Sequence, residues 1–189
     1  LGQKFSSNDT SDFENPTNLR VRTLFFEGDL AEIFPGFDPN DSKALDIGIS
    51  LGRQRLFFQD GLLINDIVDA IGLTKNNIRF EGVSWLNNLR ISILYGWNEV
   101  HRNDNIEDED ARIYALLTAA DTTWSTVEAD VIYVDSDNDE EGDLLTWGLG
   151  STSRIFGSYN FTLRYLGSKQ MNDETAQSAN GQLFFSEVS

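Results

Sequence analysis

The chain has no cysteine and only one histidine, His101, among its 189 residues. Disulfide bonds, thiolate metal sites and cysteine nucleophiles are therefore excluded. The single histidine falls in an acidic run, where a lone histidine is more often a bystander than a catalyst. The sequence also has no nucleophile elbow and no phosphate loop, so it predicts a protein that is not an enzyme.

Long hydrophobic runs are missing too, and basic residues are few. No window approaches the roughly eighteen uninterrupted apolar residues of a transmembrane helix. The 14 lysines and arginines are outnumbered by 31 aspartates and glutamates, which gives a formal net charge of -17. Phosphate binding needs a basic surface, so we expect no nucleic-acid partner. A membrane β-barrel stays possible, because alternating strands average to a hydrophilic sequence.

Apolar and polar residues alternate through much of the chain. In residues 89–97 one face is apolar and ends in Tyr95 and Trp97, while the other carries Arg90. This combination is what a strand between lipid and a wet lumen requires. We expect further strands at residues 19–27, 44–58, 78–86, 111–120, 124–134, 145–149, 159–165 and 182–188. A bulge or a strand end is expected at 52–54, and residues 62–72 have a mixed pattern that fits a folded-in loop or a short helix.

The predicted connections alternate in length. Short turns are expected at residues 87–88, 121–123 and 153–157, and long polar loops at 98–110, 135–143 and 167–181. Outer-membrane barrels show this asymmetry between short periplasmic turns and longer outer loops. The sequence therefore predicts an all-β fold, an antiparallel up-and-down transmembrane β-barrel. Residues 1–18 form a flexible lead-in, and residues 19–189 supply the barrel strands with their long acidic outer loops.

Three short motifs resemble the alginate-export family of outer-membrane porins. They are residues 51–56 (LGRQRL), 60–62 (DGL) and 80–83 (FEGV), where Glu81 replaces the Asp of that family. The resemblance extends over residues 45–170 and implies a bacterial outer-membrane barrel of about eighteen strands that passes anionic polysaccharide or other solutes. We therefore expect this chain to be part of a larger barrel, completed by further strands; a closed barrel of about eight strands is the alternative.

Arginines are the candidates for a solute path through the lumen. Inward placement is favoured because an arginine facing lipid at mid-bilayer costs roughly 2–4 kcal/mol. The expected lumen-facing residues are Arg53, Arg55, Arg79, Arg90, Arg112 and Arg164, joined by Arg20 and Arg22 if residues 21, 23 and 25 face lipid. Guanidinium groups suit carboxylates, so we expect passive diffusion of anionic or sugar-acid solutes. In the alternative, the arginines only fill the wall by pairing with Asp46, Glu81, Glu128 and Asp130.

Two other patterns have structural and functional interpretations. Asp135, Asp137 and Asp139 could converge on Ca²⁺, although the spacing is not that of an EF-hand and a solvated acidic loop is the alternative; no other cofactor is expected. Aromatic residues near strand ends predict an interfacial belt against outer-membrane lipid. They are Trp85, Tyr95, Trp97, Trp124, Tyr133, Trp147, Tyr159 and Tyr165. The same residues would also fit an ordinary β core or a sugar-stacking platform.

Two rival hypotheses remain. One is a soluble secreted β-sandwich that binds carbohydrate, with calcium in residues 135–143. The other is a barrel that anchors a partner protein and transports nothing.

Overall fold

A computed structural model describes residues 22–36, 46–102, 107–137, 142–171 and 179–189. The strands are β1 (Leu24–Asp29), β2 (Ile47–Phe58), β3 (Ile64–Ile78), β4 (Leu86–Trp97), β5 (Val100–His101), β6 (Glu107–Asp108), β7 (Arg112–Thr122), β8 (Ser125–Asp135), β9 (Leu144–Ile155), β10 (Tyr159–Gln170) and β11 (Gly181–Val188). Two short helices complete the described elements, α1 (Leu30–Ile33) and the 3₁₀ turn η1 (Gln59–Gly61). No helix of the described residues is long and apolar enough to cross a membrane.

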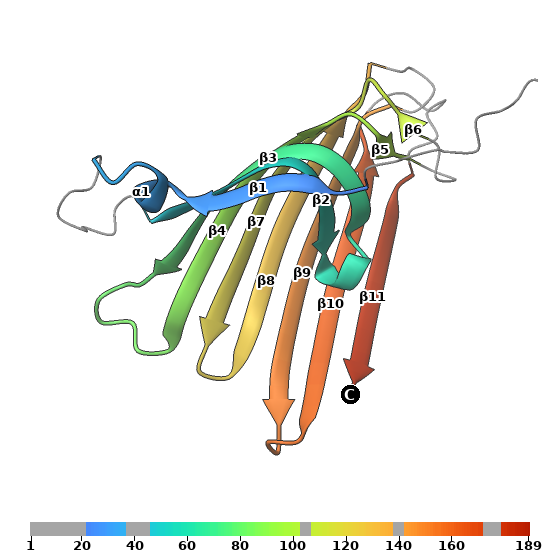
Figure 1. The fold of residues 1–189 in the computed structure, drawn as a ribbon. Helices are drawn as coiled ribbons and strands as arrows, with labels where there is room; N and C mark the ends of the chain where they lie inside the picture. Colours follow the sequence, from blue (N-terminus) through green and yellow to red (C-terminus); the bar gives the residue numbers. More distant parts are fainter. Residues whose placement is uncertain (1–21, 37–45, 103–106, 138–141, 172–178) are drawn as a thin grey trace, which may run out of the picture.

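Nine strands form one antiparallel sheet in the order β1-β2-β3-β4-β7-β8-β9-β10-β11, and β5 and β6 form a separate ribbon (Figure 1). Neighbours in the sheet are neighbours in sequence, apart from the inserted ribbon, so the topology is up-and-down. The predicted all-β antiparallel fold is confirmed. The sheet is not closed, because β1 pairs only with β2 and β11 only with β10. The expected lead-in at residues 1–18 lies outside the described residues.

The sequence prediction was wrong between residues 62 and 88. Residues 64–78 form the long strand β3, where a loop or short helix was expected over the first half. Residues 79–85 are the turn between β3 and β4, with Gly82 in the left-handed region (φ 81°), and not a strand. Asn88 lies inside β4 opposite Asp121, so residues 87–88 are not a hairpin turn.

The other connections follow the expected alternation. Short links at residues 123–124 and 156–158 join β7 to β8 and β9 to β10. The longer segments between β4 and β7, β8 and β9, and β10 and β11 all lie at the opposite end of the sheet (Figure 1). The β2–β3 hairpin leaves the sheet at this second end, since Asp69 of β3 pairs with Trp97 at the end of β4.

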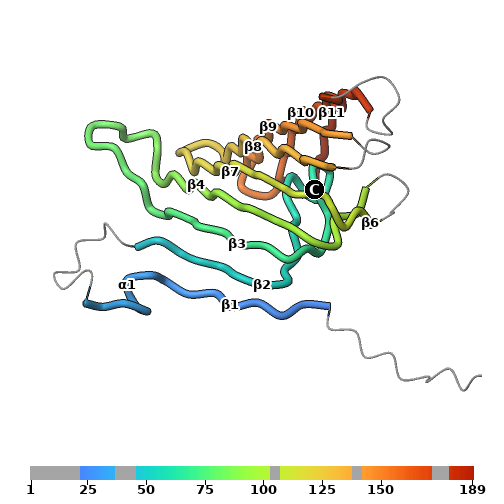
Figure 2. The backbone as a smooth tube through the Cα atoms, turned by 90° about the horizontal axis from the view of Figure 1, so that it is seen from above, coloured from blue at the N-terminus to red at the C-terminus, as the bar shows by residue number. Residues whose placement is uncertain are grey.

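The sheet is a curved wall, and the β2–β3 hairpin bends over its concave side (Figure 2). Leu56 and Val68 of the hairpin are buried against Ile113 and Leu117 of β7 and Ile132 of β8. Burying side chains of this size stabilises a fold by roughly 1.5–3 kcal/mol each, so the hairpin is packed firmly onto the wall. One part of the concave side is thus a dry core rather than an open surface.

The bend does not need the expected bulge. The pairing of β2 with β3 runs without a shift from Ile47 to Phe58. Gly52 nevertheless has a φ of 122°, and a Cβ there would lie 2.5 Å from the carbonyl oxygen of Leu24. Glycine is therefore required where β2 passes closest to β1.

Candidate functional site

The two faces of the sheet differ in chemistry. On the convex face, Ile93, Leu116, Val131 and Leu149 are between 45% and 55% exposed. They lie on four successive strands and do not meet in an interior. The concave face of the same strands carries the charged residues Arg90, Glu128, Asp130 and Arg164, as their strand register shows.

Aromatic side chains lie near both ends of the strands. At the end with the longer connections, the Tyr95 ring lies 5.6 Å from that of Trp97 and 5.2 Å from that of Tyr114, which is 6.4 Å from Tyr133. At the turn end, Trp85 is 50% exposed and Trp124 is 71% exposed. Of the aromatic residues expected at strand ends, Tyr165 differs, because it lies in the middle of β10 opposite Leu149.

The spacing of the two aromatic rows can be worked out on β8. Nine residues lead from Trp124 to Tyr133. At about 3.3 Å per residue they span roughly 30 Å along the strand. Strands of membrane barrels are tilted by about 35–45° from the barrel axis, and at this tilt the two residues would be separated by roughly 21–25 Å along the axis. The apolar band of such barrels is about 25 Å tall.

The tip of the β2–β3 hairpin is fastened to the concave face by a group of polar residues. This tip interlock consists of Gln59, Asp60, Glu128, Asp130 and Arg164. The guanidinium of Arg164, only 5% exposed, donates to Asp60 at 2.6 and 2.8 Å and to Glu128 at 2.7 Å, and also to the Gln59 side-chain oxygen. The Gln59 side-chain nitrogen donates to Asp130 at 2.6 Å. Charge-assisted bonds of this kind are among the stronger polar contacts in proteins.

A glycine of β9 and a glycine of the hairpin tip shape the interlock. A Cβ on Gly150 of β9 would lie 2.5 Å from the Gln59 side-chain oxygen and 2.6 Å from a guanidinium nitrogen of Arg164. At the tip, Gln59, Asp60 and Gly61 all have positive φ values of 54°, 56° and 79°. A Cβ on Gly61 would meet the Phe57 ring at 2.6 Å. The sequence Asp60-Gly61, expected only to turn the chain, therefore shapes the tip to fit beneath β9.

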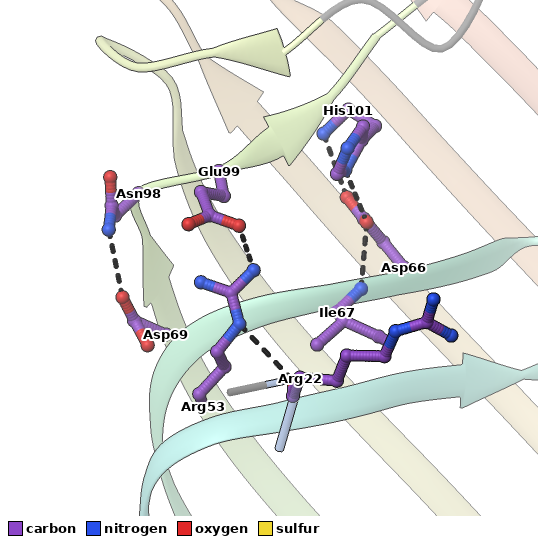
Figure 3. A network of polar contacts seen from close by, with 8 residues as sticks. All are labelled: Arg22, Arg53, Asp66, Ile67, Asp69, Asn98, Glu99 and His101. Carbon is purple, nitrogen blue, oxygen red and sulfur yellow. Dashed lines mark hydrogen bonds and ion pairs between the residues drawn. The ribbon is translucent and has the colours of Figure 1, made fainter. Parts of the chain in front are cut away.

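A second polar group lies on the outward side of the hairpin (Figure 3). Arg22, Arg53, Arg55, Asn65, Asp66, Ile67 and His101 line a pocket of about 520 Å³, which we call the arginine pocket. The Arg53 guanidinium pairs with Glu99 and also donates to the carbonyl oxygen of Arg22 at 3.2 Å.

The side chains of this pocket are held in position by their neighbours. Arg55 donates twice to the Asn65 side-chain oxygen, at 2.9 and 3.3 Å, and its guanidinium lies 4.6 Å from the centre of the Phe57 ring. Asp66 accepts from the backbone N–H of His101 and lies 2.8 Å from its Nδ1 atom. The lone histidine therefore has a structural partner that its sequence context did not suggest.

The expected lumen arginines fall into separate places. Arg53 and Arg55 share the arginine pocket, whereas Arg90 and Arg164 lie on the concave face of the wall. Arg79 is an exposed residue of the β3–β4 turn. Arg112 lies on the convex face instead, because it pairs with Trp97 across β4 and β7. It is the first residue of β7.

The acidic residues that the sequence suggested as partners of the arginines also lie in different places. Glu128 does pair with Arg164, as the wall-filling alternative anticipated. Glu81 lies in the turn at residues 79–85, far along the chain from this group. The sequence did not identify Gln59 and Asp60, which come from a hairpin 104 or 105 residues away from Arg164.

The proposed calcium ligands are only partly described. Asp135 ends β8, Asp137 lies 4.0 Å from Arg112, and Asp139 lies outside the described residues. Nearby, Asp143 accepts from the Tyr133 hydroxyl at 2.7 Å and from the Ser136 backbone N–H at 3.1 Å. In the described part of the chain, no three His, Cys, Asp or Glu side chains come together as a metal site would require. The visible acids of this region bond to the protein instead.

Comparisons with protein-family models, with curated proteins and with solved structures find no match to this chain.

Proposed function

We propose that this protein forms part of the wall of a bacterial outer-membrane β-barrel and that small polar solutes diffuse passively past its concave face. The observation that supports this most is the contrast between the two faces. Exposed aliphatic residues between two aromatic rows suit acyl chains and headgroups, while the charged concave face suits water. Outer-membrane lipid is accordingly the partner of the convex face.

Closure requires further strands in this proposal. Nine strands alternate in direction, so β1 and β11 run the same way and would meet in parallel. An antiparallel barrel therefore needs an odd number of additional strands between these two edges, and a barrel of about eighteen strands, as the alginate-export resemblance implies, would satisfy this condition. The strands would come from a longer chain or from a partner protein. Without them, both edges would leave unpaired backbone groups in the membrane.

The arginine pocket supports a preference for anionic solutes, sugar acids and acidic polysaccharide. Within the described residues, Arg22 and Arg55 form no ion pair. Arg55 is also fixed in orientation by Asn65 and Phe57, which lowers the entropy lost when it binds a carboxylate. Arg164 has a different role in this proposal: its charge is used by Asp60 and Glu128, and it holds the hairpin in place.

The test is reconstitution of the detergent-purified protein in planar bilayers. We expect ion conductance with an anion-favouring reversal potential in a salt gradient, and Arg55→Gln should reduce that preference. Arg79→Gln is the matched control, because Arg79 lies in an exposed turn. Insertion without conductance would favour a barrel that only anchors a partner. Cation preference unchanged by Arg55→Gln would remove the anionic solute but leave the channel.

The soluble β-sandwich makes the opposite prediction. It needs a second sheet over the apolar convex face, and the described strands provide no such sheet. A protein that stays monomeric in buffer without detergent would nevertheless support the sandwich and contradict the barrel.

A further inference from the structure

A separate pocket lies on the concave face, on the β1 side of the tip interlock. It has a volume of about 360 Å³ and takes residues from β1, β2, β3, β4, β7 and β8. Its charged residues are Glu27, Arg90, Glu128 and Asp130. This volume lies at the lower end of the range of small-molecule sites.

The register arranges the basic and acidic groups in one row across the wall. The row contains Arg90 of β4, Ala119 of β7, Glu128 of β8, Gly150 of β9 and Arg164 of β10. Small residues thus separate the charges. Glu128 is already paired with Arg164, and Asp130 accepts from Gln59 and from the backbone N–H of Thr118 at 3.2 Å.

Asp130 has these neutral partners but no ion pair, so the charged residues of the pocket that have neither kind of partner in the described part of the chain are Arg90 and Glu27. Among the described residues, neither Arg90 nor Glu27 forms an ion pair. One available guanidinium and one available carboxylate therefore face the same cavity. The rest of the lining includes hydroxyl groups, of which those of Thr74 and Ser92 lie 2.8 Å apart.

We propose that this pocket binds a small zwitterion of the α-amino acid class, with its carboxylate on Arg90 and its ammonium group toward Glu27. A simple anion fits less well, because Glu27, Glu128 and Asp130 would repel it. A simple cation would face the positive charge of Arg90. The inference rests on the proposed function, since it names a second class of solute for the same concave face.

The experiment measures binding to the full chain in detergent micelles by isothermal titration calorimetry, with L-glutamine as the probe. Two analogues each lack one charge: 4-carbamoylbutanoate has no ammonium group, and 4-aminobutanamide has no carboxylate. We expect both to bind up to about 5-fold more weakly than L-glutamine, because each loses one ion pair and both Arg90 and Glu27 are exposed to solvent. Equal binding of 4-carbamoylbutanoate and L-glutamine would overturn the proposal.

Variants assign the contacts. Arg90→Gln and Glu27→Gln should each weaken L-glutamine binding up to about 5-fold, and Arg90→Lys should retain more binding than Arg90→Gln. Arg79→Gln should change nothing, and circular dichroism checks that each variant is folded. Absence of L-glutamine binding to the unaltered protein would also refute the zwitterion site. Conductance in bilayers would then still decide the channel proposal independently.

Discussion

The tip interlock can be tested by replacing Arg164 with methionine. This change keeps an unbranched side chain and removes the guanidinium with its contacts to Gln59, Asp60 and Glu128. It should release the tip of the β2–β3 hairpin without unfolding the wall. The base of the hairpin stays attached, because Leu56 and Val68 remain buried in the core.

The expected loss of stability at the tip depends on how far each contact of Arg164 is exposed to water. A hydrogen bond to a charged group contributes about 1.5–3 kcal/mol when it is protected from water. The Asp60 side chain is 60% exposed, so its pairing with Arg164 is largely screened and contributes less than about 1 kcal/mol. The bonds to Glu128 and Gln59 are better protected from water, so they contribute most of the free energy that holds the tip in place. We expect Arg164→Met to lower the free energy of opening the hairpin tip by about 2–4 kcal/mol. This change raises the population of the open tip roughly 30- to 800-fold.

Hydrogen exchange of the Leu62 and Leu63 amides measures this opening. Their N–H groups bond to the carbonyl oxygens of Gln59 at 3.1 Å and Phe58 at 3.4 Å, so both bonds lie within the tip. Exchange at these amides should accelerate in Arg164→Met and stay unchanged in Arg90→Met, which alters the same row of the wall. Equal exchange in Arg164→Met and the unaltered protein would refute the reasoning.

Three further changes test the sheet itself. In the proposed barrel, Leu149→Arg on the convex face should destabilise the membrane-inserted protein by roughly 2–4 kcal/mol. Thr152→Arg, on the concave face of the same strand, should destabilise it much less. Urea unfolding of the two variants in lipid vesicles measures the difference. Gly150→Val should displace the hairpin tip, because even a Cβ would contact Gln59 and Arg164, and proteolysis of the tip should become faster. Gly52→Ala should lower the midpoint of thermal unfolding by strain between β1 and β2, and an unchanged midpoint would show that β1 moves freely.

The alternation of apolar and polar residues predicted the faces of the regular strands. It assigned Ile93 and Val131 to one face and Arg90 and Arg164 to the other, as the register confirms. These strands keep the same environment over their whole length, so a period of two residues describes them completely. Arg112 lies on the convex face because Ile113 and Leu117, which alternate with it in β7, are buried on the concave side under the hairpin.

Alternation did not predict the first half of β3, and the cause is physical. Val68 and Ala70 on one face of β3 are buried between the hairpin and the wall. Asp69 on the other face accepts a hydrogen bond from Asn98 at 2.9 Å. Apolar Ile71 then follows on the same face as Asp69. A face that changes its surroundings along one strand does not produce a uniform pattern, so the sequence looked mixed.

The change of surroundings also explains why one face of β2 is apolar at its start and basic at its end. Ile49, Leu51, Arg53 and Arg55 alternate in phase and therefore share a face. Before Gly52 the strand belongs to the curved wall, where that face is convex. Beyond it the hairpin folds over (Figure 2) with its other face packed into the core, so Arg53 and Arg55 line the arginine pocket on the face away from the core. The bend therefore separates these arginines from the apolar convex face to which the start of β2 belongs.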